Sequence, residues 1–281
     1  MFKTNSASCK KDATNVLEKI YQNNVADKMN LKFCKHILGL NNKSTNVAVQ
    51  SELGRFPIYF NIVISMISYL HRLHHCNSNL LKEAFLCNKD MHENNTITWY
   101  SSVKFILQKL ELKETYCIDY SINRLKQLIM KKLKTLFLKA WFNDKDNVNG
   151  KLDTYFSHKS NFQMEKYLDI QSFQSRQILC KFRISAHQLR VEKERHKNKP
   201  IERSQRTCNF CSHNDIEDEF HFLINCPLYN QCRESLFAQA HEHCQNFNNL
   251  DCKSKFLWLM TTEDQHILKK LCIFLIQSFQ L

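Results

Sequence analysis

Residues 121–141 read SINRLKQLIMKKLKTLFLKAW, and this stretch sets the fold that we expect. Its apolar residues recur at spacings of three and four, which is the period of one face of an α-helix. Lysines occupy much of the remaining surface, so the segment predicts an amphipathic helix with a basic outer face. The apolar positions are Ile122, Leu125, Ile129, Leu133 and Leu136.

The same period recurs along the chain. Only 3 Gly and 3 Pro are present, which leaves little material for the tight turns of a many-stranded β fold. We therefore expect a mainly α protein, built as helical bundle-like domains with one small zinc-stapled turn or strand insertion near the C-terminus. The further expected helices span residues 57–73, 97–110, 178–189 and 267–279, the last preceded by a capping box at 262–265.

The polar stretch 143–151, with Gly150 inside it, is the best boundary candidate between an N-terminal and a C-terminal part. The sequence suggests four parts: a polar N-terminal segment at 1–30, a helical region at 31–142, a basic helical connector at 151–200, and a zinc-binding segment with C-terminal helices at 201–281.

Several functional classes are excluded by pattern. The three glycines are isolated, so neither a phosphate-binding loop of P-loop type nor a dinucleotide-binding turn can be written. The N-terminus is polar and basic without an apolar stretch, so we expect an intracellular protein, nuclear or cytoplasmic, that is not secreted. The most apolar segment, Phe56–Leu70, is too short for a membrane span and is interpreted as a core helix.

Positive charge is concentrated in two places. The chain has 40 Lys+Arg against 27 Asp+Glu, a net charge of +13. Residues 124–139 contain six basic residues and no acid, and 176–206 contain ten basic residues and three acids. Such patches favour RNA or DNA bound through phosphates, although a solvated helix face is the alternative. The expected phosphate contacts are Lys131, Lys132, Lys134, Arg183, Arg190, Lys193, Arg195 and Lys197.

The segment 208–226, CNFCSHNDIEDEFHFLINC, breaks the helical pattern. Cys208, Cys211, His221 and Cys226 follow the spacing C-x2-C-x9-H-x4-C, and two close pairs of such ligands are what a tetrahedral zinc site requires. Thirteen cysteines without an export signal do not suggest a disulfide framework, because the cytosol keeps thiols reduced. We therefore predict a closed structural Zn²⁺ site, with plain burial of the cysteines as the alternative.

Two other residues compete for ligand positions. His213 lies in the same loop as His221, and Cys232 follows Cys226 in the chain. The alternation of Phe220, His221 and Phe222 favours a short strand that presents the histidine on one side. The acidic run Asp215, Glu217, Asp218 and Glu219 is interpreted as a solvated loop rather than a catalytic metal site.

Several stretches resemble one known family. EDEFHFLINCPLY (217–229), with the preceding CNFC, resembles the zinc-binding segment at the C-terminus of reverse transcriptases from non-LTR (LINE-type) retrotransposons. LKFCKHILGLNNKSTNVAVQSELGRFPI (31–58) and FRISAHQLRVEKERH (182–196) resemble other parts of the same region. So do FQMEKYLD (162–169) and TTEDQHILKKLCIFLIQSF (261–279). The resemblance covers the chain from about residue 30 onward.

The resemblance implies a fragment without catalysis. In this family the polymerase lies upstream, where paired aspartates hold two metal ions, and this chain contains no Asp-Asp pair. We therefore expect a zinc-binding, nonspecific nucleic-acid-binding fragment that is not an enzyme and has no small-molecule substrate. The polymerase portion of the same element is a further implied partner. The alternative is a structural or protein-interaction helical domain from a decayed or repurposed element.

Overall fold

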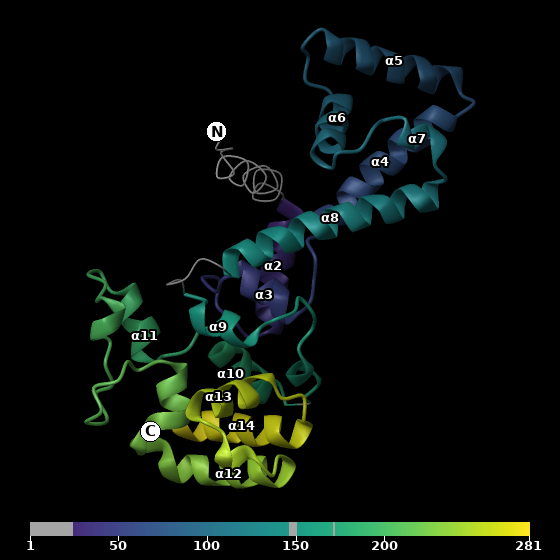
Figure 1. Cartoon of the computed structure of the whole chain (residues 1–281). Coiled ribbons are helices and arrows are strands. Elements are labelled where there is room, and N and C mark those ends of the chain that lie inside the picture. Colours follow the sequence, from purple (N-terminus) through teal and green to yellow (C-terminus); the bar gives the residue numbers. More distant parts are fainter. Residues whose placement is uncertain (1–24, 146–150, 171) are drawn as a thin grey trace, which may run out of the picture. The chain divides into compact units, whose positions relative to one another are not determined.

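The computed structural model describes residues 25–145, 151–170 and 172–281. It is mainly helical, as the periodicity predicted (Figure 1). Within the described residues, β structure is confined to two isolated bridges, Leu53 with Met164 and Thr207 with Ile216.

Parts of two expected segments, 1–24 and 146–150, lie outside the described residues. None of the described helices is long and apolar enough to cross a membrane.

The chain divides into two compact units. Unit 1 comprises Phe56–Asn143 with the preceding chain up to Asn30, and unit 2 comprises Leu31–Arg55 with Asp144–Leu281. Unit 2 is therefore assembled from two segments that unit 1 separates in sequence. Residues 151–200 and 201–281, which the sequence suggested as separate parts, both belong to unit 2.

Unit 1 is a helical bundle around one apolar core. The core faces of α4 and α8 contribute fully buried residues at helical spacing, including Val63, Ile67, Leu125 and Ile129. Three of the five apolar positions predicted for 121–141 are buried, and Ile122 and Leu136 are partly buried. The helices are α2 (Val25–Ile37, which continues into unit 2), α4 (Tyr59–His75), α5 (Asn79–Glu93), α6 (Trp99–Lys109), α7 (Tyr116–Asp119) and α8 (Ile122–Lys145).

A carboxylate from α2 caps the start of α4. The backbone N–H groups of Ile58 and Tyr59 donate to the Asp27 carboxylate at 2.7 and 3.2 Å. The first N–H groups of a helix have no intrahelical partner, so this buried aspartate stabilises a helix that begins two residues after Pro57.

Unit 2 is organised around α14, which lies between α10 and α12 (Figure 1). Phe182, Phe222, Phe274 and Phe279 form an aromatic cluster here, in which Phe222 and Phe279 stack with ring centroids 4.7 Å apart. The helices are α3 (Asn46–Glu52), α9 (Asp153–His158), α10 (Phe173–Arg183), α11 (Arg190–Lys193), α12 (Asn230–His243), α13 (Cys252–Thr261) and α14 (Gln265–Ser278).

A buried ionic cluster joins the two segments of unit 2. The Arg183 guanidinium, at the end of α10, donates to both carboxylate oxygens of Glu52 in α3, at 3.0 and 3.3 Å. Its other contacts are Glu165 at 3.0 Å and the carbonyl of Met260. Lys159 also pairs with Glu165. Because Glu52 and Glu165 surround it, the pKa of Arg183 lies above its ordinary value despite burial.

Two expected helices have the wrong ends. The helix expected over 178–189 begins at Phe173 and ends at Arg183, and Ser185 just beyond it adopts a positive φ of 53°. The final helix is capped by Asp264 rather than by a capping box that begins at Thr262: the Asp264 carboxylate accepts from the N–H groups of His266 and Ile267. Short side chains compete for cap positions, and spacing alone did not separate them.

Candidate metal centre

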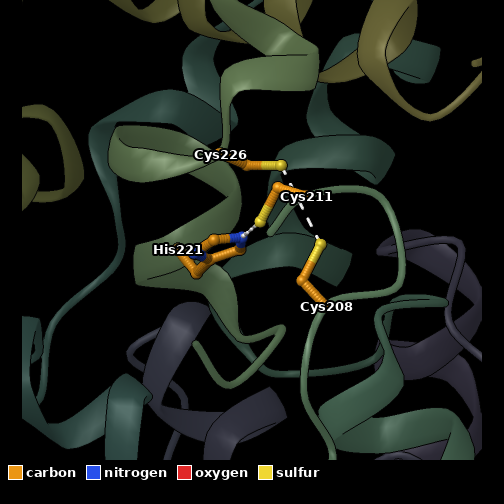
Figure 2. A group of neighbouring side chains, drawn as sticks. All are labelled: Cys208, Cys211, His221 and Cys226. Atoms are coloured by element: carbon orange, nitrogen blue, oxygen red, sulfur yellow. Dashed lines mark hydrogen bonds between the residues drawn. The ribbon is translucent and has the colours of Figure 1, made fainter. Parts of the chain in front are cut away.

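The structure brings together Cys208, Cys211, His221 and Cys226, and their ligand atoms all lie within 4.8 Å of one another (Figure 2). The sulfurs of Cys208 and Cys226 are 3.9 Å apart, and the Cys211 sulfur is 3.4 Å from His221 Nε2. A tetrahedral site with metal–sulfur bonds of about 2.3 Å would separate two sulfurs by roughly 3.8 Å, and a sulfur from a nitrogen by roughly 3.5 Å. The group could therefore hold a metal ion.

The first pair of ligands lies beside a short turn. The bridge between Thr207 and Ile216 closes it, with the Cys208 N–H donating to the Asp215 carbonyl at 2.8 Å. Asn214 adopts a positive φ of 55°, which this residue type tolerates better than most. The backbone N–H of Phe210 donates to the Cys208 sulfur at 3.4 Å, a contact that would stabilise a thiolate there.

The second pair lies on one turn of helix. His221–Asn225 forms a π-helical turn, in which the Cys226 N–H donates to the His221 carbonyl at 2.8 Å. The strand expected around His221 is therefore wrong. The wide turn places the histidine and the cysteine five residues apart at adjacent corners of the group. The Asp218 carboxylate accepts from the His221 N–H at 3.0 Å and so caps the turn.

Arg233, in α12, fixes this turn from behind. Its buried guanidinium donates to the carbonyls of Leu223 at 2.8 Å, Cys226 at 2.9 Å and Phe222 at 3.2 Å. Three backbone acceptors at the end of the turn are satisfied by one side chain. The Phe222 ring packs into the aromatic cluster described above, so the histidine ligand is attached to the core of unit 2 by its neighbour.

Burial favours the neutral form of Cys208, His221 and Cys226. It raises the pKa of Cys208 to about 12 and that of Cys226 above its ordinary value, and it lowers the pKa of His221. Asp215 acts in the opposite direction on the histidine, because its carboxylate lies 3.4 Å from His221 Nδ1. A bound cation would supply the charge that favours thiolates in this setting.

The two competing ligands lie outside the group. His213 is exposed, and Cys232 is partly buried in α12, but neither belongs to the set of ligand atoms within 4.8 Å. The structure therefore favours His221 and Cys226 at these positions. Among the described residues this is the one group of three or more Cys, His, Asp or Glu side chains arranged to hold a metal ion.

The acidic run is only in part the solvated loop expected from the sequence. Asp215 is exposed, but Glu217 and Glu219 are buried. Glu219 accepts from Ser185 and lies 2.8 Å from His187 Nε2, and these contacts hold the pKa of the carboxyl at about 2, although burial alone would raise it. The sequence does not predict the burial and pairing of Glu219, because its partners Ser185 and His187 lie about 30 residues upstream.

The basic residues of α8 are largely unpaired. Lys131 and Lys134 are exposed, and neither forms an ion pair within the described part of the chain. Lys132 lies 3.5 Å from Glu111, which is itself exposed. Lys134 lies over the Phe56 ring at 5.0 Å. Of the three phosphate contacts expected on α8, Lys131 and Lys134 are thus exposed and Lys132 is half-buried.

Most basic residues of the connector differ from those of α8, because they form ion pairs with neighbouring glutamates. Lys197 pairs with Glu194 at 2.6 Å, Arg195 pairs with Glu192 at 3.1 Å, and Arg190 lies 3.7 Å from Glu194. Arg190 also donates to the Thr207 carbonyl and to Asn209. Lys193 is exposed and forms no ion pair among the described residues.

Arg183 does not belong with the phosphate contacts. Its side chain is 4% exposed and is held by Glu52 and Glu165 in the interior of unit 2. A phosphate cannot reach this guanidinium in the folded protein. The expected contact at Arg183 is therefore wrong, because its acidic partner Glu52 lies far away in sequence.

No protein-family model, curated protein or solved structure matches the chain.

Proposed function

We propose that the chain is a nonenzymatic nucleic-acid-binding protein in which Cys208, Cys211, His221 and Cys226 hold a structural Zn²⁺ ion. The group of four ligands within 4.8 Å carries this proposal. Three sulfurs and one imidazole suit zinc among the divalent metals, and four protein ligands leave no open position for chemistry. Zinc would fix the turn at 208–216 to the helical turn at 221–225.

Nucleic acid would bind on the exposed surface of α8. Lys131, Lys132 and Lys134 supply the positive charge there, and Lys193 adds one exposed cation in the connector. Contacts between lysines and phosphates give affinity without sequence reading, so the preference among RNA or DNA sequences should be slight. The resemblance to the C-terminal region of LINE-type reverse transcriptases supports this proposal, and it adds the polymerase portion of such an element as a candidate partner.

A metal analysis combined with a salt titration tests the proposal. The purified chain should contain about one equivalent of zinc. Its affinity for random oligonucleotides should fall with a log-log slope of about −4 to −8, for a handful of phosphates at roughly 0.7 to 0.9 each. Absence of zinc together with binding that is insensitive to salt would overturn it.

A second candidate function is protein interaction, and α5 carries the observation that favours it. This helix buries only Phe85 among its 15 residues. Leu80, Leu86 and Met91 are 76%, 56% and 47% exposed. Large exposed apolar side chains gathered on one helix are typical of interaction surfaces. If the wild-type chain binds no oligonucleotide at low salt but self-associates, and L80E/L86E abolishes that self-association, the interaction function is the better one.

A further inference from the structure

Unit 1 contains a pocket, lined in part by polar side chains, that the proposed function does not use. It has a volume of about 530 Å³, and Ile122, at the start of α8, contributes to its wall. None of the lining residues is acidic. The polar lining comes from successive turns of α4, at helical spacing: Ser65, Ser68, His71, Arg72 and His75.

Arg72 brings an uncompensated positive charge to this pocket. Its side chain is exposed and forms no ion pair with any described residue. The guanidinium lies 4.9 Å from the centre of the Tyr69 ring, on the preceding turn of α4. Such a cation–π contact holds the planar group and leaves its N–H donors available, which suits recognition of an oxyanion.

The two histidines have fixed donor directions. His71 Nε2 lies 3.1 Å from the Tyr120 carbonyl, and His75 Nδ1 lies 2.8 Å from the His71 carbonyl. A carbonyl only accepts, so each of these nitrogens carries its proton. The rings stack with centroids 4.3 Å apart. The second nitrogen of each ring has no protein partner among the described residues, and in the protonated ring it becomes a donor to an anion.

A hydroxyl adds to the polar lining. Ser65, on the first of these turns, is exposed and lines the same pocket. We propose that this pocket binds a phosphate group. A guanidinium and two imidazoles within about one turn of α4 can donate to the oxygens of a phosphate, whereas the arginine and the lack of a carboxylate disfavour a metal cation. The inference goes beyond the proposed function, because it concerns a separate site that needs no zinc and no α8 lysine.

Inorganic phosphate is the direct probe. It would be titrated into the full-length, metal-loaded chain at constant ionic strength, with the ring C–H signals of His71 and His75 followed by NMR. We expect saturable shifts of both rings. R72Q should weaken phosphate binding at least about tenfold, because a charge-assisted contact is lost.

The matched control is K82Q, which removes one exposed positive charge from α5 of the same unit, outside the pocket. This variant should bind phosphate like the wild type. Shifts that do not saturate, or equal weakening by R72Q and K82Q, would overturn the inference. Circular dichroism of both variants would establish that α4 remains folded.

The phosphate could come from a small molecule or from the end of a strand. A 5′-phosphorylated oligonucleotide that binds more tightly than its 5′-hydroxyl form, with the gain lost in R72Q, assigns the pocket to a strand end. Equal binding of both strands, together with R72Q-sensitive binding of a mononucleotide, assigns it to a free phosphate compound. If the wild-type chain binds oligonucleotides but not inorganic phosphate, the pocket proposal is refuted and the α8 surface stands. If it binds inorganic phosphate but not oligonucleotides, only the proposed α8 surface is refuted.

Discussion

α8 and the connector carry similar runs of basic residues but present them differently. On α8 the lysines alternate with a buried apolar stripe, and among the lysines whose side chains are described only Lys132 has an acidic partner, which is itself exposed. In the connector, Glu192 and Glu194 are buried beside Arg195 and Lys197 and neutralise them locally. The difference shows that the availability of a charge depends on its neighbours in the fold. A count of basic residues therefore overestimates the positive charge that the connector can offer to a phosphate.

Removal of the metal should have the largest effect and should separate the two regions. The connector is hydrogen-bonded to the segment that carries the metal centre. The Val191 N–H donates to the Glu217 carbonyl, and Arg190 donates to Thr207 and Asn209. C208S or C226S should release the zinc, whose apparent binding is worth about 10–16 kcal/mol in small zinc domains. Hydrogen exchange should then accelerate in 190–226, while α8 keeps its protection.

A serine variant of Cys232 is the matched control for that experiment, because it removes a neighbouring thiol outside the group. C232S should keep one equivalent of zinc. Retention of zinc in both C208S and C226S would contradict the assignment, and loss in C232S alone would transfer a ligand position to that residue.

Arg183 tests the buried side of the same contrast. R183M should destabilise unit 2 by about 3–5 kcal/mol, because Glu52 would be left as an uncompensated buried charge and Glu165 would keep only Lys159 as its partner. It should not alter the salt dependence of oligonucleotide binding. The loss of stability is measured by denaturant titration, with hydrogen exchange of the α10 amides as the readout for unit 2. A changed salt slope with stability unaltered would mean that Arg183 contacts phosphate after all.

The lysines of α8 test the exposed side. Replacing Lys131, Lys132 and Lys134 with Ala should flatten the log-log salt slope by about 2 to 3 units, without changing the zinc content. The paired residues supply the control: R195Q/K197Q should change the slope by less than about one unit. Equal effects of the two variants would remove the distinction between the regions.

The smallest effect should come from releasing a paired cation. E194Q removes the partner of Lys197 and Arg190, so the salt slope should steepen by up to about one unit. E202Q makes the same charge change just after the connector, at an exposed residue that has no ion pair among the described residues. If E202Q steepens the slope as much as E194Q, net charge rather than local pairing governs binding.

Local patterns predicted a good part of this molecule. The spacing of Leu125, Ile129 and Leu133 was enough for the core face of α8, because helical period and burial are linked directly. The four metal-centre residues were equally readable, since all lie within 19 residues and pair at short spacings. The metal itself, and any nucleic acid, remain predictions.

What the sequence could not supply depends on distant partners or on ambiguous short patterns. Phe220, His221 and Phe222 alternate as a strand would, yet the capping Asp218 and the carbonyls bound by Arg233 stabilise a helical turn. Arg183 looks like one more surface cation until Glu52, 131 residues away, is placed beside it. Side-chain burial of this kind is set by tertiary contacts, which no local window contains.

The interrupted course of unit 2 has a consequence for synthesis on the ribosome. All residues of unit 1 have been synthesised once Asn143 has emerged. Glu52, by contrast, lacks its ionic partner until Arg183 has emerged, and unit 2 lacks α14 until Ser278 has emerged. At typical translation rates the interval between the emergence of Asn143 and that of Ser278 is on the order of 10 s. During this interval Leu31–Arg55 lacks its partners, so the nascent chain exposes apolar residues such as Leu31, Leu38 and Val49. Chaperone binding in this window is expected to fall on that segment.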